Sequence, residues 1–593
     1  MEYELIAIAA VILVVAVSVL APRVGVAAPL VLVVLGLGIA SLPIVDSIAI
    51  PPELILGGIL PPLLYSAAVN TPSMEFRRDF RLISLFSVVL VAVSAVVIGL
   101  LACALVPGLP LGIGIALGAI ISPTDAVATA VIRQAGVSQR IVTVIEGESM
   151  LNDATALVLL RSAVAAIGVS VTVWQVALDF LWAVAAAALI GYVVGRLNLA
   201  VRARVVPVTS SVTISLVVPF LAYIPAEELG ASGLVAVVTA GLVTGYGSPR
   251  KLGAEERITE RSLWRTIELL LESAVFLLVG LEAPALAEDL VEQGGGLGLA
   301  LMVAVGATTV AILLRSLFVA GSVAWLARRN RRTPTVRKHL TEIQERLADG
   351  EVPQLGNPER SGRKEHRVRR LVRAAEASAR GGSARSEEAR LGTWQRMVNQ
   401  RLADLDYLAA EAFGWREGVV LVWAGMRGAV TVAAAQTLPS GTEHRSLLVL
   451  AAALVAVGTL LVQGGTLGWL AKRLGLTGHS LDSDPVLWAA LQRELNRAAM
   501  TRLSGELDDY PPDLVEKARE RLHLLTSVED FRPDSPANQA SMAKYRRLRL
   551  KLIGAQRDEL MAIRDLGTYP SGMLDAALAQ LDADQIGIEL RSA

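Results

Sequence analysis

The 593-residue chain has one cysteine, Cys103, so no disulfide can form within the chain and no cysteine-based metal site is possible. Its 55 basic residues balance 55 acidic ones, and this neutrality gives no indication of a nucleic-acid partner. All five histidines lie outside the long apolar runs described below, which argues against proton carriage by histidine inside a membrane. The first residues lack a basic segment and a small-residue cleavage site, so we expect a spanning helix there rather than a signal peptide.

Apolar residues, in contrast, are abundant: they make up 53% of the chain, and the mean hydropathy is +0.53. Apolar runs of about 18 residues or more recur along most of the chain, and each is long enough to span a bilayer as a helix. We therefore predict an all-α polytopic membrane protein with about 13 transmembrane helices. The predicted spans are residues 4–21, 25–43, 53–70, 83–105, 110–134, 142–167, 174–195, 208–224, 230–246, 265–283, 298–326, 417–438 and 446–471.

The charges between the runs predict the topology. Arginine and lysine concentrate in alternate connections, which places the N-terminus outside and the C-terminus in the cytoplasm of an inner-membrane protein. Four parts follow: spans 1–11 in residues 1–326, an Arg-rich helical insertion in 327–416, two spans in 417–475, and a helical C-terminal domain in 476–593. The two cytoplasmic parts are either solvated helical appendages or regulators of transport with an unknown ligand.

A charge at the centre of a spanning helix is costly, by about 2.5–3.5 kcal/mol on insertion scales, and indicates function. The fifth predicted span carries Asp125 near its middle, two residues after Pro123. Proline removes a backbone donor and breaks a helix. A broken helix offers backbone groups to an ion at membrane depth. The alternative is a simple kink, with Asp125 capping a half-helix.

The sixth predicted span offers several oxygen ligands on adjoining helix faces. Glu148 and Asn152 are four residues apart, and so are Ser149 and Asp153. Hard monovalent cations prefer such carboxylate, hydroxyl and amide oxygens. The alternative is hydrogen bonding between helices, which explains the serine and the asparagine but not two acidic residues.

The twelfth predicted span has Arg427 at its centre, between Gly425 and Gly428. Arginine remains charged and needs an acidic or carbonyl partner at this depth. We predict that Glu148 is that partner, in a structural ion pair. Asp125 and Asp153 then remain as the carboxylates that exchange protons.

Three long segments carry a family resemblance: SPTDAVAT (122–129), EGESMLNDATALV (146–158) and WAGMRGAVTVA (423–433). With several other segments, in order over about 1–326 and 417–476, they resemble the monovalent cation/proton antiporters of the NhaP and eukaryotic sodium/proton exchanger type. The resemblance implies inverted repeats, crossing broken helices, a homodimer in membrane lipid and an elevator-type movement. It also implies Na⁺ or Li⁺ exchange for H⁺, usually electroneutral and serving pH homeostasis, with no cofactor beyond the transported ions.

By this resemblance, Asn152 and Asp153 match the family's Asn-Asp pair, in which the aspartate binds the cation and the proton alternately. Ser149, Asp125 and the main-chain carbonyl of Thr124 would complete the Na⁺ site. The family's intramembrane ion pair falls on Glu148 and Arg427, in agreement with the pair predicted above.

Two positions depart from the family pattern. Ser66 stands where family members often have an acidic residue, and Glu272 stands where they often have asparagine. The first departure leaves the choice of ion open, so a K⁺/H⁺ antiporter of the same fold is the alternative function. The additional acid at Glu272 either alters the charge balance or lies at the edge of the core without effect. An ion channel and an intramembrane aspartyl protease are remoter alternatives. A protease would leave Asn152, Glu148 and Arg427 without a role, and the chain has no GxGD motif.

Overall fold

The computed structural model describes most of the chain, and every regular element in the described part is helical. The described residues are 2–24, 28–41, 54–71, 73–125, 127–165, 173–292, 296–330, 333–348, 387–410, 413–439, 441–476, 484–504, 510–512, 515 and 536–590.

The chain divides into two compact units. The first, here called the membrane unit, comprises Met1–Ser322 and Trp415–Ser480, and the second unit comprises Val323–Gly414 and Leu481–Ala593. The helices that begin in the membrane unit are α1 (Glu2–Val24), α2 (Ala28–Ala40), α3 (Leu60–Asn70), α4 (Ser73–Ser84), α5 (Val91–Leu105), α6 (Leu111–Ile121), α7 (Val127–Gln134), α8 (Gln139–Ala165), α9 (Val173–Arg202), α10 (Val208–Glu228), α11 (Gly233–Lys251), α12 (Ala254–Glu292), α13 (Leu297–Asn330), α17 (Trp415–Trp423), α18 (Ala429–Gln436), α19 (Arg445–Thr459) and α20 (Gly465–Arg473). In the described part of this unit, π-helical turns at Leu85–Leu90 and Leu460–Gly464 join α4 to α5 and α19 to α20, and a third at Leu54–Ile59 directly precedes α3.

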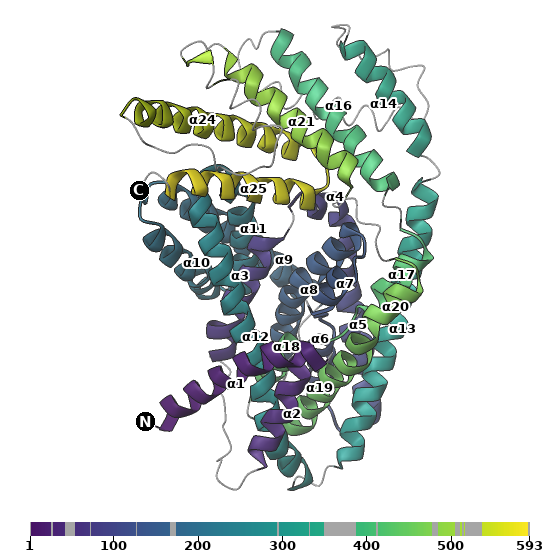
Figure 1. Ribbon diagram of the computed structural model, residues 1–593. Helices are drawn as coiled ribbons and strands as arrows, with labels where there is room; N and C mark the ends of the chain where they lie inside the picture. The colour runs from purple at the N-terminus through teal and green to yellow at the C-terminus, as the bar shows by residue number, and fades with distance from the viewer. Residues whose placement is uncertain are drawn as a thin grey trace. The chain divides into compact units, whose positions relative to one another are not determined.

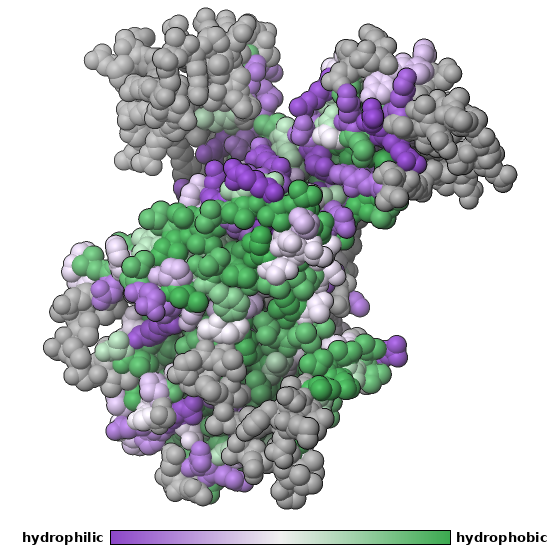
Figure 2. All heavy atoms as spheres, turned by 90° about the vertical axis from the view of Figure 1, so that its left-hand side faces the viewer, coloured by the Kyte–Doolittle hydropathy of each residue, from purple (hydrophilic) through white to green (hydrophobic). Residues whose placement is uncertain are grey.

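Among the described residues, six helical segments are long and apolar enough to cross a membrane. They are Met74–Leu105, Leu178–Arg202, Val208–Glu228, Ala254–Val291, Leu297–Arg328 and Arg445–Arg473. Every predicted span overlaps at least one described helix, but the count of 13 crossings and the inverted repeats stay predictions. Hydrophobic side chains cover much of the outer surface of this unit (Figure 2), as expected of a surface that faces lipid tails.

Within the membrane unit, α6, α8 and α18 lie in the interior, and α10 and α13 lie toward its outside (Figure 1). Burial agrees with this arrangement, because most residues of α6, α8 and α18 are buried, whereas large apolar side chains of α10 and α13 are exposed. Of the candidate site residues, Glu148, Ser149, Asn152 and Asp153 lie on α8, Thr124 and Asp125 lie between α6 and α7, and Arg427 lies between α17 and α18.

Four helix pairs pack through glycines so closely that their backbones touch. A Cβ added at Gly36 of α2, for instance, would stand 2.5 Å from the carbonyl oxygen of Leu277 in α12. Small residues allow such close approach between helices in lipid, where van der Waals packing drives their association. The other three pairs are α5 with α6 at Gly118, α9 with α11 at Gly191, and α3 with α11 at Gly245.

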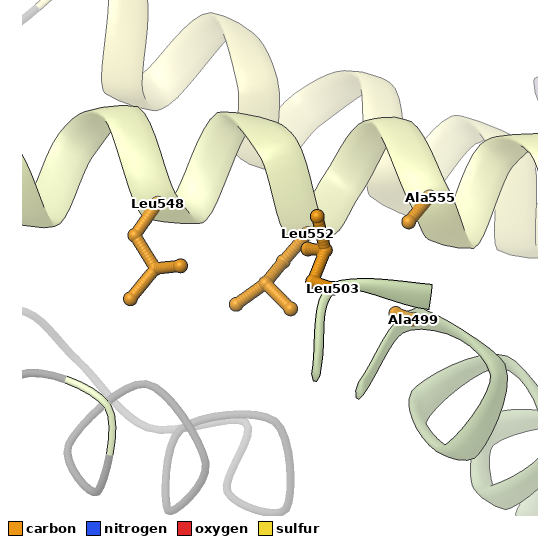
Figure 3. Packing of buried hydrophobic residues seen from close by; sticks show 5 residues of the cluster. All are labelled: Ala499, Leu503, Leu548, Leu552 and Ala555. Atoms are coloured by element: carbon orange, nitrogen blue, oxygen red, sulfur yellow. The ribbon is translucent and has the colours of Figure 1, made fainter. Parts of the chain in front are cut away.

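The second unit combines parts of the insertion 327–416 and of the C-terminal segment 476–593, which the sequence analysis predicts as two separate parts. Its helices are α14 (Thr333–Ala348), α16 (Glu387–Ala410), α21 (Pro485–Arg502), α24 (Pro536–Leu566) and α25 (Ser571–Leu590). Ala499, Leu503, Leu548, Leu552 and Ala555 form a buried cluster between α21 and α24 (Figure 3). Hydrogen bonds tie the insertion to the C-terminal helices: the Gln400 side chain donates to the Asp565 carbonyl at 3.1 Å.

We expect Gly36→Ala to lower the free energy of unfolding of the membrane unit by about 1–3 kcal/mol, the usual effect of overpacking. Gly38→Ala is the matched control on the same helix, since a Cβ there meets nothing within 4 Å. It should be neutral or slightly stabilising, because alanine favours helix over glycine. Thermal denaturation of the purified variants in detergent checks this; equal Tm values for the two would contradict the close α2–α12 contact.

Candidate functional site

Two interrupted helices meet at the centre of the membrane unit. The first interruption separates α6 from α7 and contains Asp125, and the second separates α17 from α18 and contains Met426. The backbone N–H of Asp125 donates to the carbonyl of Met426 at 2.8 Å, so each break satisfies part of the other. Both interruptions fall where Pro123 and the pair of glycines beside Arg427 predict them.

Two buried arginines cap the ends of the half-helices. Arg427 donates through Nε to the carbonyl of Ile121, the last residue of α6, at 2.8 Å. Arg315 of α13 donates through Nε to the carbonyl of Leu421, near the end of α17, at 2.9 Å. Carbonyls at a helix C-terminus have no intrahelical partner and carry partial negative charge, so a guanidinium satisfies both needs.

The predicted ion pair between Glu148 and Arg427 is wrong in its basic partner. Arg315 binds Glu148 with both terminal nitrogens: Nη1 to Oε1 and, at 2.9 Å, Nη2 to Oε2. Arg427 is directed instead to the carbonyls of Ile121 and Gly425, and its backbone N–H donates to Thr459. The physical reason is that Arg427 lies in an interruption, where backbone carbonyls without intrahelical partners are within reach of its guanidinium and take the place of Glu148.

Arg315 is a residue of the candidate site that the sequence analysis missed. The sequence feature that identified Arg427 also marks Arg315: each is a single charged residue inside a long apolar run, which for Arg315 is the predicted span 298–326. Arg315 and Glu148 are nearly inaccessible, with side-chain exposures of 3% and 1%. A bidentate arginine–carboxylate pair at such depth links α13 to α8 with fixed geometry.

Thr124 forms one hydrogen-bond network with three other predicted site residues, Glu148, Ser149 and Asn152. Ser149 donates its hydroxyl to the Thr124 carbonyl at 2.7 Å, and Asn152 donates its amide to Thr124 Oγ1 at 2.8 Å. Thr124 Oγ1 in turn lies 3.4 Å from Glu148 Oε1. The network ties the α6–α7 interruption to α8.

Asp153 is buried beside this network with an unsatisfied oxygen. Its relative exposure is 5%, and among the described residues neither its Oδ1 nor the Oδ1 of Asn152 has a hydrogen-bond partner. Asp153 and Asp125 lie close enough to interact electrostatically. Buried polar atoms are nearly always paired in native proteins, so these two oxygens are available to a ligand or a proton.

Gly428 keeps room for the carboxylate of Asp125. A Cβ added at Gly428 would overlap that carboxylate, so no other residue fits at this position without movement. Among the described residues, no three side chains of the His, Cys, Asp and Glu types lie close enough to hold a metal ion jointly. Two carboxylates with hydroxyl, amide and carbonyl oxygens suit a monovalent cation better than a tightly held divalent one.

Polar contacts also join the helices around the two interruptions, α6, α7, α8, α17 and α18, here called the broken-helix bundle, to the surrounding helices. Arg161 of α8 makes an ion pair of 2.5 Å with Glu227 of α10, whose other oxygen accepts from the N–H of Gly233. Gln436 of α18 donates to Glu282 of α12. Ser66, one of the two departures noted in the sequence, donates to Glu268 of α12 at 2.8 Å.

The comparisons with known proteins agree with this fold and site. The family described as "Sodium/hydrogen exchanger, transmembrane" matches residues 8–339 and 399–473, and the chain belongs to it. The family consists of cation/proton exchange transporters, so the chain is an antiporter and not an enzyme, which excludes the protease alternative. No cofactor is expected for such a transporter.

Two relatives are similar along most of the chain. An uncharacterized Na⁺/H⁺ exchanger of Mycobacterium tuberculosis is 27% identical, over 96% of this chain and 93% of the relative. The Na⁺/H⁺ antiporter ApNhaP of Aphanothece halophytica is 27% identical, over 82% of this chain and 75% of the relative. The solved structure of the sodium/proton antiporter MjNhaP1 of Methanocaldococcus jannaschii shares the fold, with a TM-score of 0.51 and 16% identity, over 80% and 99% of the two chains.

A double-mutant cycle on stability distinguishes the two arginines. Glu148→Gln leaves Arg315 buried without its counter-charge, which we expect to cost about 3–5 kcal/mol, and Arg315→Gln should cost a similar amount. In the double variant the two losses should be strongly non-additive, because neither charge is left unpaired. The same cycle with Arg427→Gln serves as the control and should show much weaker coupling to Glu148. Stronger coupling to Arg427 would restore the pairing predicted from sequence.

Gly428→Ala should abolish cation-dependent proton movement in reconstituted vesicles while the protein still folds, because the new methyl group displaces the Asp125 carboxylate. Gly458→Ala is the control, since a Cβ there meets nothing within 4 Å. Transport by Gly428→Ala at the wild-type rate would show that Asp125 need not hold the described position.

Proposed function

We propose that this antiporter exchanges Na⁺, and also Li⁺, for protons, with Asp153 as the group that binds the cation and the proton alternately. The observation that carries the proposal is the unpaired, buried Oδ1 of Asp153 beside Asp125, where the two interrupted helices meet. Asp125, Ser149, Asn152 and the carbonyl of Thr124 are the further ligands in this proposal. Glu148 and Arg315 hold the site together and carry no ion.

Competition explains the exchange. A dehydrated cation and a proton cannot both occupy Asp153, so high proton concentration displaces the cation and high cation concentration displaces the proton. Because Ser149 already donates to the Thr124 carbonyl, a cation at this place would replace that hydrogen bond and use both oxygens. The cation thus gains ligands from groups that are satisfied when the site is protonated.

The movements of cation and proton are coupled because moving the site while it is empty costs free energy. A bare carboxylate at the centre of the bilayer costs about 2.5–3.5 kcal/mol on insertion scales, so only the loaded forms cross readily. We propose an elevator-type movement of the broken-helix bundle and an electroneutral exchange of one cation for one proton. The ion pair between Arg161 and Glu227 is a contact that such a movement would have to break.

The wider setting belongs to the same proposal. We place the protein in the inner membrane as a homodimer, with the N-terminus outside and both parts of the second unit in the cytoplasm. There the insertion 327–416 and the segment 476–593 would regulate transport in response to a ligand, and the transporter would serve pH homeostasis. The parts of the chain follow the boundaries 1–326, 327–416, 417–475 and 476–593.

The test is a vesicle assay with a pH dye inside and an imposed proton gradient, to which Na⁺, Li⁺ or K⁺ is added. Wild type should dissipate the gradient with Na⁺ and Li⁺, and Asp153→Asn should fall to the background rate because it cannot exchange a proton. Asp179→Asn, an exposed substitution of the same kind on α9, should retain wild-type activity.

Other outcomes decide between alternatives. A larger response to K⁺ than to Na⁺ would support the K⁺/H⁺ antiporter. Acceleration by an imposed membrane voltage would contradict electroneutral exchange, and a single-channel current would contradict an exchanger. Unimpaired exchange by Asp153→Asn would remove Asp153 from its proposed role.

A further inference from the structure

Helices α17 and α20 lie side by side in the membrane unit (Figure 1). They meet at both ends of α17. The indole N–H of Trp423 donates to Thr466 Oγ1 at 2.8 Å, and Arg416 Nη1 lies 3.9 Å from the position that a Cβ on Gly475 would take. The start of α17 is thus next to the end of α20, and the two helices run antiparallel. This end of the pair lies on the side that the charge pattern of the sequence predicts to be cytoplasmic.

Three positive charges gather at this end of the pair. Arg416 lies in the first turn of α17, Lys472 and Arg473 lie in the last turn of α20, and all three are exposed. Helix α20 carries no acidic residue, and α17 carries one, the half-exposed Glu417. In the described part of the chain, none of the three basic side chains makes an ion pair. Their charges are therefore available to a negative group from outside the chain.

Exposed tryptophans accompany the two arginines. The guanidinium carbon of Arg416 lies 5.7 Å from the ring centre of Trp415, and that of Arg473 lies 5.3 Å from the ring centre of Trp469. The relative exposures of Trp415 and Trp469 are 65% and 59%. Tryptophan prefers the boundary between hydrocarbon and headgroups, because its ring is apolar and its N–H is polar. The rings therefore place both guanidinium groups at the height of lipid headgroups.

Away from the basic end, the same surface of the pair is mostly apolar. Along α20 and the π-helical turn before it, exposed residues follow at steps of three or four and share one face: Val462, Thr466, Trp469 and Arg473. Val462 is 54% exposed, and Val419 of α17 is 38% exposed. A molecule along this surface thus meets apolar side chains over most of its length and two guanidinium groups at one end. The α17–α20 surface, as it is called here, consists of Trp415, Arg416, Val419, Val462, Trp469, Lys472 and Arg473.

We propose that the α17–α20 surface binds an anionic phospholipid, whose phosphate accepts hydrogen bonds from Arg416 and Arg473 and whose acyl chains lie along the apolar side chains. Lipid covers this surface in any case, since α20 belongs to a segment long and apolar enough to cross a membrane. The headgroup is the specific part of the proposal. The planar forks of two arginines without ion pairs match the oxygens of a phosphate. A zwitterionic lipid carries an ammonium group besides its phosphate, so a cluster of positive charges attracts it less.

A lipid at this surface would act on the second interruption through α17. That half-helix leads into the interruption that contains Met426, and its Leu421 carbonyl accepts from Arg315. The segment α19–α20 carries Thr459, which accepts from the backbone N–H of Arg427. A lipid that bridges α17 and α20 would hold both sides of this interruption together and so stabilise the membrane unit.

The experiment measures thermal stabilisation of the purified full-length protein by lipid in detergent micelles. Phosphatidylglycerol, the anionic probe, should raise the Tm at lower concentration than phosphatidylcholine, the zwitterionic one. Arg416→Gln and Arg473→Gln should each raise the phosphatidylglycerol concentration for half-maximal stabilisation about fivefold, the effect of one basic residue near anionic lipid. The control is Arg261→Gln, which removes an exposed arginine near the start of α12 on the same predicted side. It should leave this concentration unchanged.

Three results would overturn the proposal. The first is an equal response of wild type to phosphatidylglycerol and phosphatidylcholine. The second is an equal loss in Arg261→Gln, since general attraction to anionic lipid would then explain the effect. The third is equal stabilisation by inorganic phosphate at the same concentrations, which would make this an anion site without a lipid.

A defect in folding is distinguished from a loss of lipid binding in two ways. The Tm without added lipid shows whether each variant folds like wild type. Arg473→Lys keeps the charge but loses the planar fork, so it should recover part of the loss seen in Arg473→Gln. No recovery in a lysine variant that folds normally would contradict a role of this charge in lipid binding.

Discussion

The structure of the membrane unit depends on one constraint: backbone groups within a bilayer must find partners in the protein. Two interrupted helices expose carbonyls and amides at the depth where water is absent. Asp125 and Met426 satisfy one pair by a direct backbone bond, and Arg427 and Arg315 satisfy the ends of α6 and α17. The two interruptions thus supply partners for each other, and Arg315 of α13 supplies a further one.

Those arginines create a second requirement, because each brings a charge into the interior. Glu148 compensates Arg315, and the same carboxylate lies beside Thr124, whose carbonyl and hydroxyl organise Ser149 and Asn152. The same few side chains thus give hydrogen bonds to the exposed backbone groups, balance the buried charge and position the candidate ligands. Asp153 contributes to this centre a buried Oδ1 that has no hydrogen-bond partner among the described residues, and the proposed transport chemistry uses that atom.

Much of this arrangement could be predicted from the sequence, because its signals are local. Pro123 and the glycines around Arg427 predict the interruptions, and the spacing within EGESMLND predicts which oxygens share a helix face. The partner of Glu148 could not be predicted, because two arginines lie at comparable depth and only packing decides between them. The assembly of residues 323–414 with 481–593 into one unit was also beyond reach, since it depends on contacts between helices distant in sequence.

The glycine contacts divide the membrane unit mechanically. Where backbones touch, as between α2 and α12 or α9 and α11, neither helix can shift along the other without collision, so each pair behaves as one solid part. In the proposed elevator movement, a link made by long polar side chains, such as that from Arg161 to Glu227, would open and the two helices would then meet at a different height. In this movement, the glycine contacts mark the helix pairs that we expect to move together, and the side-chain links mark the contacts that we expect to open.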